Sequence, residues 1–214
     1  MSMRKRIAEG KLFTDYCEGL PQDRLQAKKR MMAFNRTEPD DIEKRMSLMT
    51  EIFGKETKAW IEPPIYLCYG TNIEIGEGSY INFNCNFVDD TKITLGKKVF
   101  IAPGVTIATT GHPIHPDYRN YMYGNPVTIR DNVWIGSGAI ICPGVEIGEN
   151  TVIGAGSVVT KNIPANSVAV GNPCKVLRPI NEDDYQYYYR DRPFTQEDLD
   201  EEANLRKGGK HYEE

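Results

Sequence analysis

The stretch that decides the fold is residues 129–159, which read IRDNVWIGSGAIICPGVEIGENTVIGAGSVV. A branched aliphatic residue recurs at every sixth position, and glycine directly follows three of these residues. The aliphatic positions are Ile129, Ile135, Ile141, Ile147, Ile153 and Val159. A spacing of six drifts around an α-helix, so an amphipathic helix does not fit the pattern. Repetition at this period predicts a parallel β-helix built from hexapeptides.

Three hexapeptides make one triangular coil, so the chain returns to the same face after about 18 residues. Each aliphatic side chain then points inward and stacks on its counterpart one coil below, and burying one is worth roughly 1.5–3 kcal/mol before entropy. Glycine suits the sharp corners. The same phase runs through Ile75, Ile81 and Phe87 and reappears, displaced by two residues, at Leu95, Ile101 and Ile107. We therefore predict a mainly β domain over residues 61–180.

The repeat has one clear interruption, which begins after Ile107. The residues GHPIHPDYRNYMYGNP intervene before the strand pattern restarts at Val127. We predict that residues 112–126 form a loop that protrudes from a corner of the coil. Loops on rigid scaffolds often carry function. His112 lies at the root of this loop, and His115 lies within it.

The two ends of the chain differ from the repeat in composition and in the spacing of their apolar residues. Residues 1–60 are charged and poor in glycine, and four apolar residues there share one helical face. These residues are Ile42, Met46, Met49 and Phe53. Pro21 indicates an earlier helix start. We predict an N-terminal helical segment over 1–60 that contributes to the acceptor site, and an acidic C-terminal tail over 181–214 with a short helix and a disordered end.

Composition narrows the function classes. The net charge is −4 with acids and bases mixed, which argues against nucleic acid or an anionic membrane as partner. No apolar run approaches the length of a membrane span, and no apolar stretch follows the basic N-terminus. The five cysteines are odd in number, scattered and without a CxxC pair. Reduced thiols in the cytoplasm are the simplest interpretation.

Several segments resemble one enzyme family. They are GKLFTDYCEGLPQDRLQAKK, PPIYLCYGTNIEIGEGSYINFNCNFVDD, IAPGVTIATTGHPIHP and the repeat quoted above. Together they resemble the bacterial galactoside, maltose and nodulation O-acetyltransferases over roughly residues 5–180, and VDD and GHPIH are closer to the galactoside branch. The resemblance implies a left-handed β-helix, a homotrimer and direct transfer of acetyl from acetyl-coenzyme A to a sugar hydroxyl. The expected acceptor is the 6-hydroxyl of a galactoside.

By this resemblance His112 is the general base. A sugar hydroxyl is a poor nucleophile and must lose its proton as it attacks the thioester. An imidazole with an unperturbed pKa of about 6.5 is partly neutral near pH 7, and positioned base catalysis contributes ~10²–10⁴-fold. His115 is the alternative base, although we expect it to shape the loop. Zinc needs three or four ligands, and two loop histidines with a distant His211 do not predict a metal site.

The resemblance also implies an acceptor pocket. Its expected members are Asp15, Cys68, Tyr80, Asn82, Asp90 and Met122. The two carboxylates suit paired sugar hydroxyls because each can accept two hydrogen bonds. Asn82 is expected near both substrates, and Met122 is expected to cover the sugar. Cys68 departs from the Ser or Asp of relatives, and its weaker hydrogen bonding leaves the sugar preference open.

For the donor, the resemblance implies a coenzyme groove. Its expected members are Asn82, Trp134, Ser137, Ala155, Thr160, Lys161, Lys175 and Arg178. The Ser137 backbone N–H is the implied oxyanion donor, and losing such a donor typically costs ~10²–10³ in rate. The three basic residues suit the coenzyme phosphates.

Three alternatives remain open at this point. The first is a maltose- or glucose-type acceptor. The second is a metalloenzyme of the γ-carbonic-anhydrase kind on the same scaffold. The third is a β-helix without catalysis that serves assembly, in which the same histidine, aspartates and lysines are ordinary loop, turn and surface residues.

Overall fold

The structure is a computed structural model, and it describes residues 1–201. The chain divides into two units, Met1–Arg178 and Pro179–Glu214. The second unit contains the short helix α4 (Asp183–Gln186) and an antiparallel pair, β19 (Tyr187–Tyr189) and β20 (Arg192–Pro193). The predicted disordered end lies outside the described residues. Within those residues, no helix is long and apolar enough to cross a membrane.

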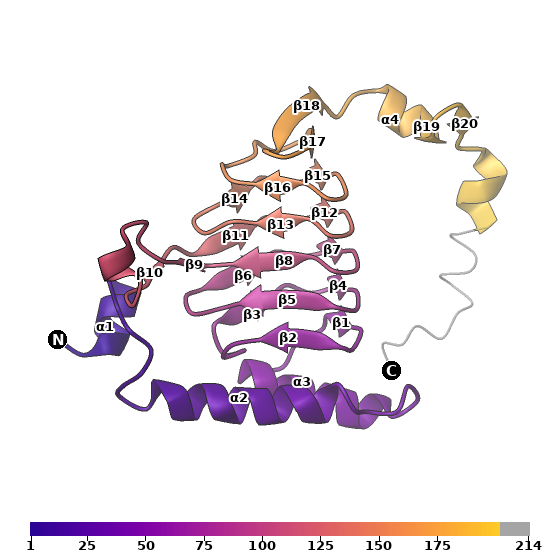
Figure 1. Cartoon of the computed structure of the whole chain (residues 1–214). Helices are drawn as coiled ribbons and strands as arrows, with labels where there is room; N and C mark the ends of the chain where they lie inside the picture. The colour runs from indigo at the N-terminus through magenta and orange to yellow at the C-terminus, as the bar shows by residue number, and fades with distance from the viewer. Residues whose placement is uncertain (202–214) are drawn as a thin grey trace. The chain divides into compact units, whose positions relative to one another are not determined.

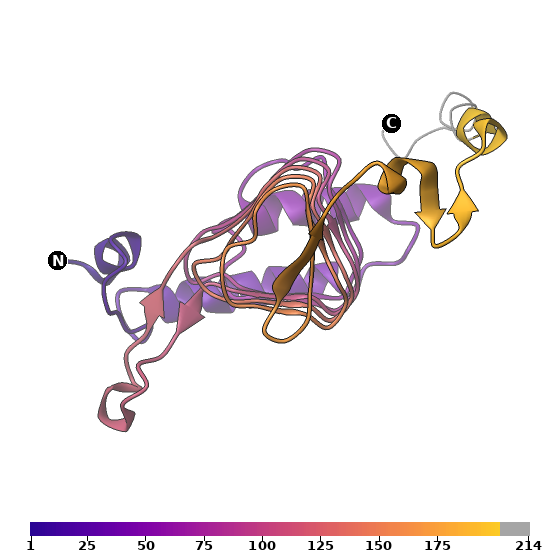
Figure 2. The same cartoon turned by 90° about the horizontal axis from the view of Figure 1, so that it is seen from above.

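The first unit is a parallel β-helix with three faces, seen from the side in Figure 1 and from above in Figure 2. Face 1 contains β1 (Trp60–Ile61), β4 (Tyr80–Ile81), β7 (Phe100–Ile101), β12 (Trp134–Ile135), β15 (Val152–Ile153), β17 (Ser167–Val170) and β18 (Lys175–Pro179). Face 2 contains β2 (Ile65–Leu67), β5 (Cys85–Val88), β8 (Thr106–Ala108), β13 (Ile140–Ile141) and β16 (Val158–Val159). Face 3 contains β3 (Ile73–Ile75), β6 (Ile93–Leu95), β11 (Val127–Ile129) and β14 (Glu146–Ile147).

The six-residue pattern forms the core as predicted. On face 1, the register aligns Ile81 with Ile101, Ile101 with Ile135, and Ile135 with Ile153. All four side chains are at most 1% exposed. The hexapeptide β-helix and its inward aliphatic columns are therefore confirmed, and the handedness stays an implication of the family resemblance.

The coils are not all 18 residues long. In the upper part Trp134 pairs with Val152, 18 positions later, but lower down Tyr80 pairs with Phe100, 20 positions later. The extra residues lie at one place, the corner between faces 2 and 3, which we call the 2/3 corner. The inward residues on either side of it are Leu67 and Ile75, then Phe87 and Leu95, then Ile107 and Ile129, then Ile141 and Ile147. The steps are eight, eight, twenty-two and six positions, so three successive coils expand at the same corner.

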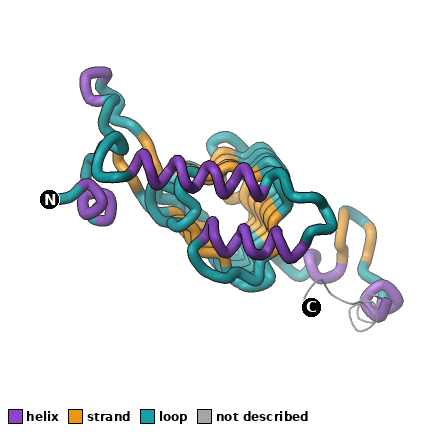
Figure 3. Tube along the Cα trace, turned by 90° about the horizontal axis from the view of Figure 1, so that it is seen from below, coloured by secondary structure: helices purple, strands orange, loops and turns teal. Residues whose placement is uncertain are grey.

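The N-terminal segment closes the lower end of the coils. Its two longer helices, α2 (Leu20–Phe34) and α3 (Ile42–Phe53), lie side by side across the bottom coil in Figures 1 and 3. Pro21 stands in the first turn of α2, as predicted. On α3, Met49 is buried, but Met46 is exposed and Arg45 is buried in its place. The prediction for Met46 is therefore wrong: the buried face of α3 includes Arg45, the residue before it, instead.

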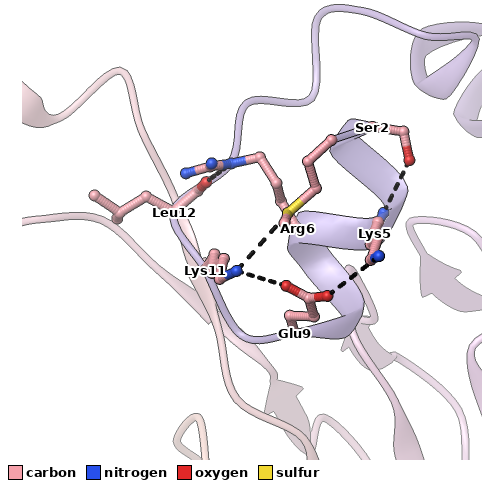
Figure 4. Close-up of polar contacts among 7 residues, drawn as sticks. Ser2, Lys5, Arg6, Glu9, Lys11 and Leu12 are labelled. Atoms are coloured by element: carbon pink, nitrogen blue, oxygen red, sulfur yellow. Dashed lines mark hydrogen bonds and ion pairs between the residues drawn. The ribbon is translucent and has the colours of Figure 1, made fainter.

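The first helix, α1 (Met3–Ala8), is fixed by polar contacts, which Figure 4 displays. The Ser2 hydroxyl accepts from the Lys5 N–H, and Glu9 forms ion pairs with Lys5 and Lys11. The Arg6 side chain donates to the Leu12 carbonyl at 2.6 Å. These contacts direct the chain from α1 into the stretch that runs beside the predicted loop.

The expanded third coil forms that loop. It leaves through β9 (Thr110–Gly111) and returns through β10 (Tyr123–Gly124), which pair antiparallel, with a short 3₁₀ turn, η1 (Pro116–Tyr118), between them. The N-terminal stretch attaches to it because Phe13 and Met122 exchange two backbone hydrogen bonds, at 2.9 and 2.8 Å. Helical segment and loop are therefore joined at the 2/3 corner.

Candidate functional site

The 2/3 corner gathers several of the predicted site residues. Cys68 lies in the corner of the first expanded coil, Asp90 in the second, and His112 at the root of the loop in the third. Asp15 approaches from the N-terminal stretch, and Met122 is buried on the returning side of the loop. The coil stacks residues far apart in sequence at one corner, which is why they lie together.

His112 has a defined orientation. Its Nδ1 lies 2.8 Å from the carbonyl oxygen of Arg119 and 3.0 Å from that of Tyr121, both on the loop. Carbonyl oxygens only accept, so Nδ1 must carry the proton that is shared with them. In the neutral imidazole, Nε2 then holds the free lone pair. The side chain itself is exposed, which leaves Nε2 reachable by a substrate.

Asp90 is a buried carboxylate on the same corner. Burial raises its pKa above the usual value, and the positive charges of Arg24 and His112 oppose that shift. Asp90 also lines a cavity together with Leu20, Asp23 and Arg30 of α2. A carboxylate in this position can accept hydrogen bonds from a bound ligand while it remains electrostatically coupled to the imidazole.

Asp15 is held by a residue that the sequence did not point to. Its carboxylate forms an ion pair with the Arg24 guanidinium, and Arg24 also donates to the Asp15 carbonyl at 3.3 Å. Both side chains are largely buried, at 14% and 21% exposure. Arg24 reads in sequence as one of several charges on α2, and its pairing becomes visible only once α2 lies beneath the corner.

Cys68 and Tyr69 form the lowest layer of the corner. Burial raises the pKa of the Cys68 thiol to about 12, and the charges of Asp90 and Asp89 add to that effect. Burial also raises the pKa of Tyr69, which Arg24 opposes. Cys68 therefore stands as a neutral thiol beside two carboxylates. Tyr69 and Asp89 are further members of this region that the sequence interpretation missed.

A second group of predicted residues lies elsewhere on the chain. Tyr80 and Trp134 are on face 1, and Asn82, Ser137 and Ala155 are at the corner that follows it, between faces 1 and 2. Ser137 and Ala155 occupy the same place in successive coils, and the Gly156 N–H donates to the Ser137 carbonyl. The structure of one chain thus assembles two groups of predicted residues, at two different corners.

The remaining candidates lie toward the upper end. Thr160 and Lys161 follow β16 at the 2/3 corner, above the loop, and both are exposed. Lys175 and Arg178 are on β18. The predicted basic cluster is therefore divided between the 2/3 corner and face 1.

A cavity of about 590 Å³ adjoins the 2/3 corner on the side of α1 and α2. Its wall includes Asp90 and Tyr69, together with the basic side chains of Arg4, Arg30 and Lys92. Asp90 therefore borders this cavity as well as the loop side of the corner. Among residues 1–201, no three His, Cys, Asp or Glu side chains group as metal ligands would, and His211 lies outside that range.

Family models match two parts of the chain. Residues 6–56 match the maltose acetyltransferase hexapeptide capping motif, and residues 126–161 match the bacterial transferase hexapeptide of six repeats. The galactoside O-acetyltransferase of Escherichia coli (strain K12) is 54% identical over 194 residues, which covers 89% of this chain and 96% of that protein. The galactoside O-acetyltransferase of Lactococcus lactis is 41% identical, covering 92% and 96%.

Solved structures agree with these relatives. A galactoside acetyltransferase in complex with coenzyme A has a TM-score of 0.87 and 51% identity, covering 92% of this chain and all of that one. A maltose O-acetyltransferase from Clostridium difficile 630 has a TM-score of 0.82 and 46% identity, covering 85% and 99%. Fold, capping segment and repeat all match along nearly the full length of these enzymes, so the chain belongs to the hexapeptide-repeat O-acetyltransferases of the galactoside and maltose family.

Proposed function

We propose that this protein transfers the acetyl group of acetyl-coenzyme A to the 6-hydroxyl of a galactoside, with His112 as the general base. The observation that carries this proposal is the contact of His112 Nδ1 with two loop carbonyls. It fixes the tautomer whose Nε2 accepts a proton, at the place where the loop leaves the coil. The similarity to galactoside O-acetyltransferases supports the acceptor and donor classes.

The reaction proceeds by direct attack. The acceptor hydroxyl gives its proton to His112 Nε2 while its oxygen bonds to the thioester carbon, and the Ser137 N–H stabilises the oxyanion of the tetrahedral intermediate. The carbon–sulfur bond then breaks, and the imidazolium returns the proton to the leaving thiolate. No bond to the enzyme forms, so the products are the acetyl ester and free coenzyme A.

Carboxylates at the 2/3 corner hold the acceptor. Asp15 and Asp90 accept hydrogen bonds from sugar hydroxyls, and Met122 packs over the ring. Arg24 holds Asp15 in place through their ion pair. Tyr80 and Asn82 complete the pocket, and Cys68 contacts the sugar only weakly because a thiol is a poor hydrogen-bond partner.

Donor binding uses the remaining predicted residues, on face 1, at the corner between faces 1 and 2, and at the upper end of the 2/3 corner. Trp134, Ala155 and Thr160 line the path of the pantetheine arm, and Lys161, Lys175 and Arg178 face the phosphates. The acceptor residues and the donor residues come together in a homotrimer. There the corner between faces 1 and 2 of one copy, which we call the 1/2 corner, meets the 2/3 corner of its neighbour. Exposed apolar side chains on faces 1 and 2 and at the corner between them support such an assembly; they are Phe83, Phe100, Trp134 and Ile140.

A maltose- or glucose-type acceptor is the second candidate, favoured by the similarity to a maltose O-acetyltransferase. A panel of galactosides, glucosides and maltose, assayed for thiol release from acetyl-coenzyme A, separates the two. The galactoside proposal requires the highest kcat/KM to fall on a galactoside, and a preference for maltose would replace it.

The base assignment is tested with His112→Ala, matched by His115→Ala on the same loop. We expect His112→Ala to lower kcat by about 10²–10⁴-fold and to leave the KM for acetyl-coenzyme A within about twofold. His115→Ala should retain most activity, because its Nδ1 serves the local turn by accepting from the Asp117 N–H. Near-normal turnover in His112→Ala, or a larger loss in His115→Ala, would exclude His112 as the base.

A further inference from the structure

Asp89, the first acid of the VDD sequence, is completely buried at the 2/3 corner. Its carboxylate accepts three backbone hydrogen bonds from the corner one coil below. Oδ1 accepts from the Cys68 N–H at 2.8 Å and the Tyr69 N–H at 3.0 Å, and Oδ2 accepts from the Gly70 N–H at 2.7 Å. One side chain therefore holds three consecutive amides of the turn, which we call the 68–70 turn.

The 68–70 turn needs such a support because the corner is expanded. At the regular parts of a coil, amides donate to carbonyls of the next coil, as Asn86 does to Val105 at 2.9 Å. With two extra residues, the backbone bulges out of that ladder, so the amides of the turn lose their usual carbonyl partners. A buried amide without a partner costs about 1–3 kcal/mol. Asp89 replaces the missing carbonyls with two charged oxygens.

The turn is also closed from below. Gly70 has a left-handed backbone, with φ of +77°, and a side chain there would lie 2.6 Å from the Ile52 carbonyl of α3. Asn72 strengthens the connection from its own side, because its Nδ2 donates to the Asp89 carbonyl at 2.7 Å. The turn is therefore held between α3 and Asp89, and it has little room to shift while both contacts persist.

The turn adjoins the proposed acceptor pocket, because Tyr69 and Asp90 line the same cavity of about 590 Å³. The charge of Asp90 also contributes to the raised pKa of the Cys68 thiol. Asp89 itself has both oxygens occupied by amides and no exposed surface, so it cannot contact a sugar. We propose that Asp89 is a positioning residue for the acceptor, which fixes the 68–70 turn and thereby the wall formed by Cys68 and Tyr69. This inference rests on the proposed function.

The test compares Asp89→Asn with Asp131→Asn. An amide in place of Asp89 offers only one accepting oxygen, and its NH₂ group faces an amide donor. Asp131 is a matched control, because its Oδ1 accepts the Lys97 N–H at 2.9 Å from the coil below, at the corner between faces 3 and 1. Burial raises the pKa of Asp89 to about 6, so assays at pH 8 keep the native carboxylate ionised.

We expect Asp89→Asn to raise the acceptor KM by about tenfold or more and to leave kcat and the KM for acetyl-coenzyme A within about twofold. Asp131→Asn should leave all three constants near wild type. An unchanged acceptor KM in folded Asp89→Asn, or an equal rise in both KM values, overturns the proposal.

Hydrogen exchange followed by mass spectrometry gives a second readout that needs no activity. The amides of residues 68–70 should exchange at least about tenfold faster in Asp89→Asn and at the native rate in Asp131→Asn. If the amides of residues 68–70 exchange at the native rate in Asp89→Asn, Asp89 does not fix the turn and the proposal is overturned. A wild-type protein that acetylates no sugar would instead contradict the proposed function, while the exchange comparison still decides whether Asp89 holds the turn.

A milder variant keeps the proposal testable if Asp89→Asn does not fold. Asn72→Ala removes the amide that donates to the Asp89 carbonyl and leaves the carboxylate in place. We expect a smaller change in the same direction, with a raised acceptor KM and faster exchange of residues 68–70. A native acceptor KM together with native exchange in Asn72→Ala would then overturn the inference.

Discussion

At the scale of single residues, the Cys68 thiol reports the electrostatics of the corner. Its pKa is raised to about 12, first by burial and then by the charge of Asp90. A raised thiol pKa means less thiolate at any pH below it, so at pH 8 only about 10⁻⁴ of Cys68 is thiolate. We expect iodoacetamide to leave Cys68 almost unmodified at pH 8, and the rate to rise about tenfold per pH unit above it.

The companion variant is Asp90→Asn, which removes one of the two neighbouring negative charges. Its Cys68 should have a lower pKa and should react faster than the wild-type thiol at pH 9, as measured by peptide mass mapping after timed alkylation. If Cys68 in the folded wild-type protein is alkylated at pH 8 as fast as in the unfolded chain, the neutral-thiol assignment is wrong.

His112 and Arg24 differ in how far the sequence could identify them. The GHP sequence at the end of a repeat run marks His112 because the periodicity stops beside it. Arg24 carries no such mark, since a basic residue on α2 is an ordinary surface charge until its ion pair with Asp15 is seen. The family resemblance points to Asp90 alone, and sequence spacing does not tell that the adjacent Asp89 is also buried and holds a backbone turn.

At the scale of elements, the corners decide how closely coils can stack. A side-chain carbon on Gly76 would lie 2.4 Å from the backbone carbonyl of Gly96, one coil above. Gly78, two residues later on the same corner, has a left-handed backbone with φ of +71°, and a side-chain carbon there would make only ordinary contact, 3.4 Å from Lys98 Cγ. Substitution of Gly76 therefore tests the steric limit on coil spacing, and substitution of Gly78 tests backbone strain.

We expect Gly76→Ala to lower the free energy of unfolding by about 3 kcal/mol or more, because the two coils must move apart. Gly78→Ala should cost only about 1 kcal/mol, the strain of a left-handed alanine. Urea unfolding of both variants at one protein concentration measures the difference. If the two variants lose equal free energy of unfolding, or Gly78→Ala loses more, then the close approach of the two coils at Gly76 does not determine stability at this corner.

The elements also mark the limit of prediction from periodicity. Aliphatic residues at a spacing of six identified the core because only inward positions must be apolar. The same rule does not describe the corners. The extra residues of 88–92 show in the sequence only as a phase displaced by two from Leu95 onward, and those of 68–72 were not predicted. Met46 was misplaced for a similar reason, since a helical stripe predicts which residues share a face but not how that face meets its neighbour.

At the scale of the whole molecule, the two groups of site residues raise a geometric question. His112 and Asp90 lie at the 2/3 corner, whereas Asn82 and Ser137 lie at the 1/2 corner of the same chain. In the trimer that we propose, a site that uses both groups draws them from two copies. In a closed ring of three, each copy would then contribute one corner to each of two sites, giving three sites per trimer.

Mixed trimers test this arrangement directly. His112→Ala and Asn82→Ala should each be nearly inactive alone, yet a mixed trimer has one interface at which a native His112 meets a native Asn82. Random assembly from equal amounts, by co-expression with two different tags, should therefore restore about a quarter of wild-type activity. The control is a mixture of the two purified homotrimers without exchange, which should stay inactive.

The same experiment distinguishes the alternatives. If the site lies within one copy, each mixed trimer holds only defective sites, and co-expression restores nothing. A protein that light scattering shows to be a monomer of 24.2 kDa would contradict the trimer outright. Activity near a quarter of wild type in the whole mixture, and near a third in the doubly tagged fraction, in which every trimer has one intact site of three, requires that one copy supply the base and its neighbour the Asn82 side of the groove.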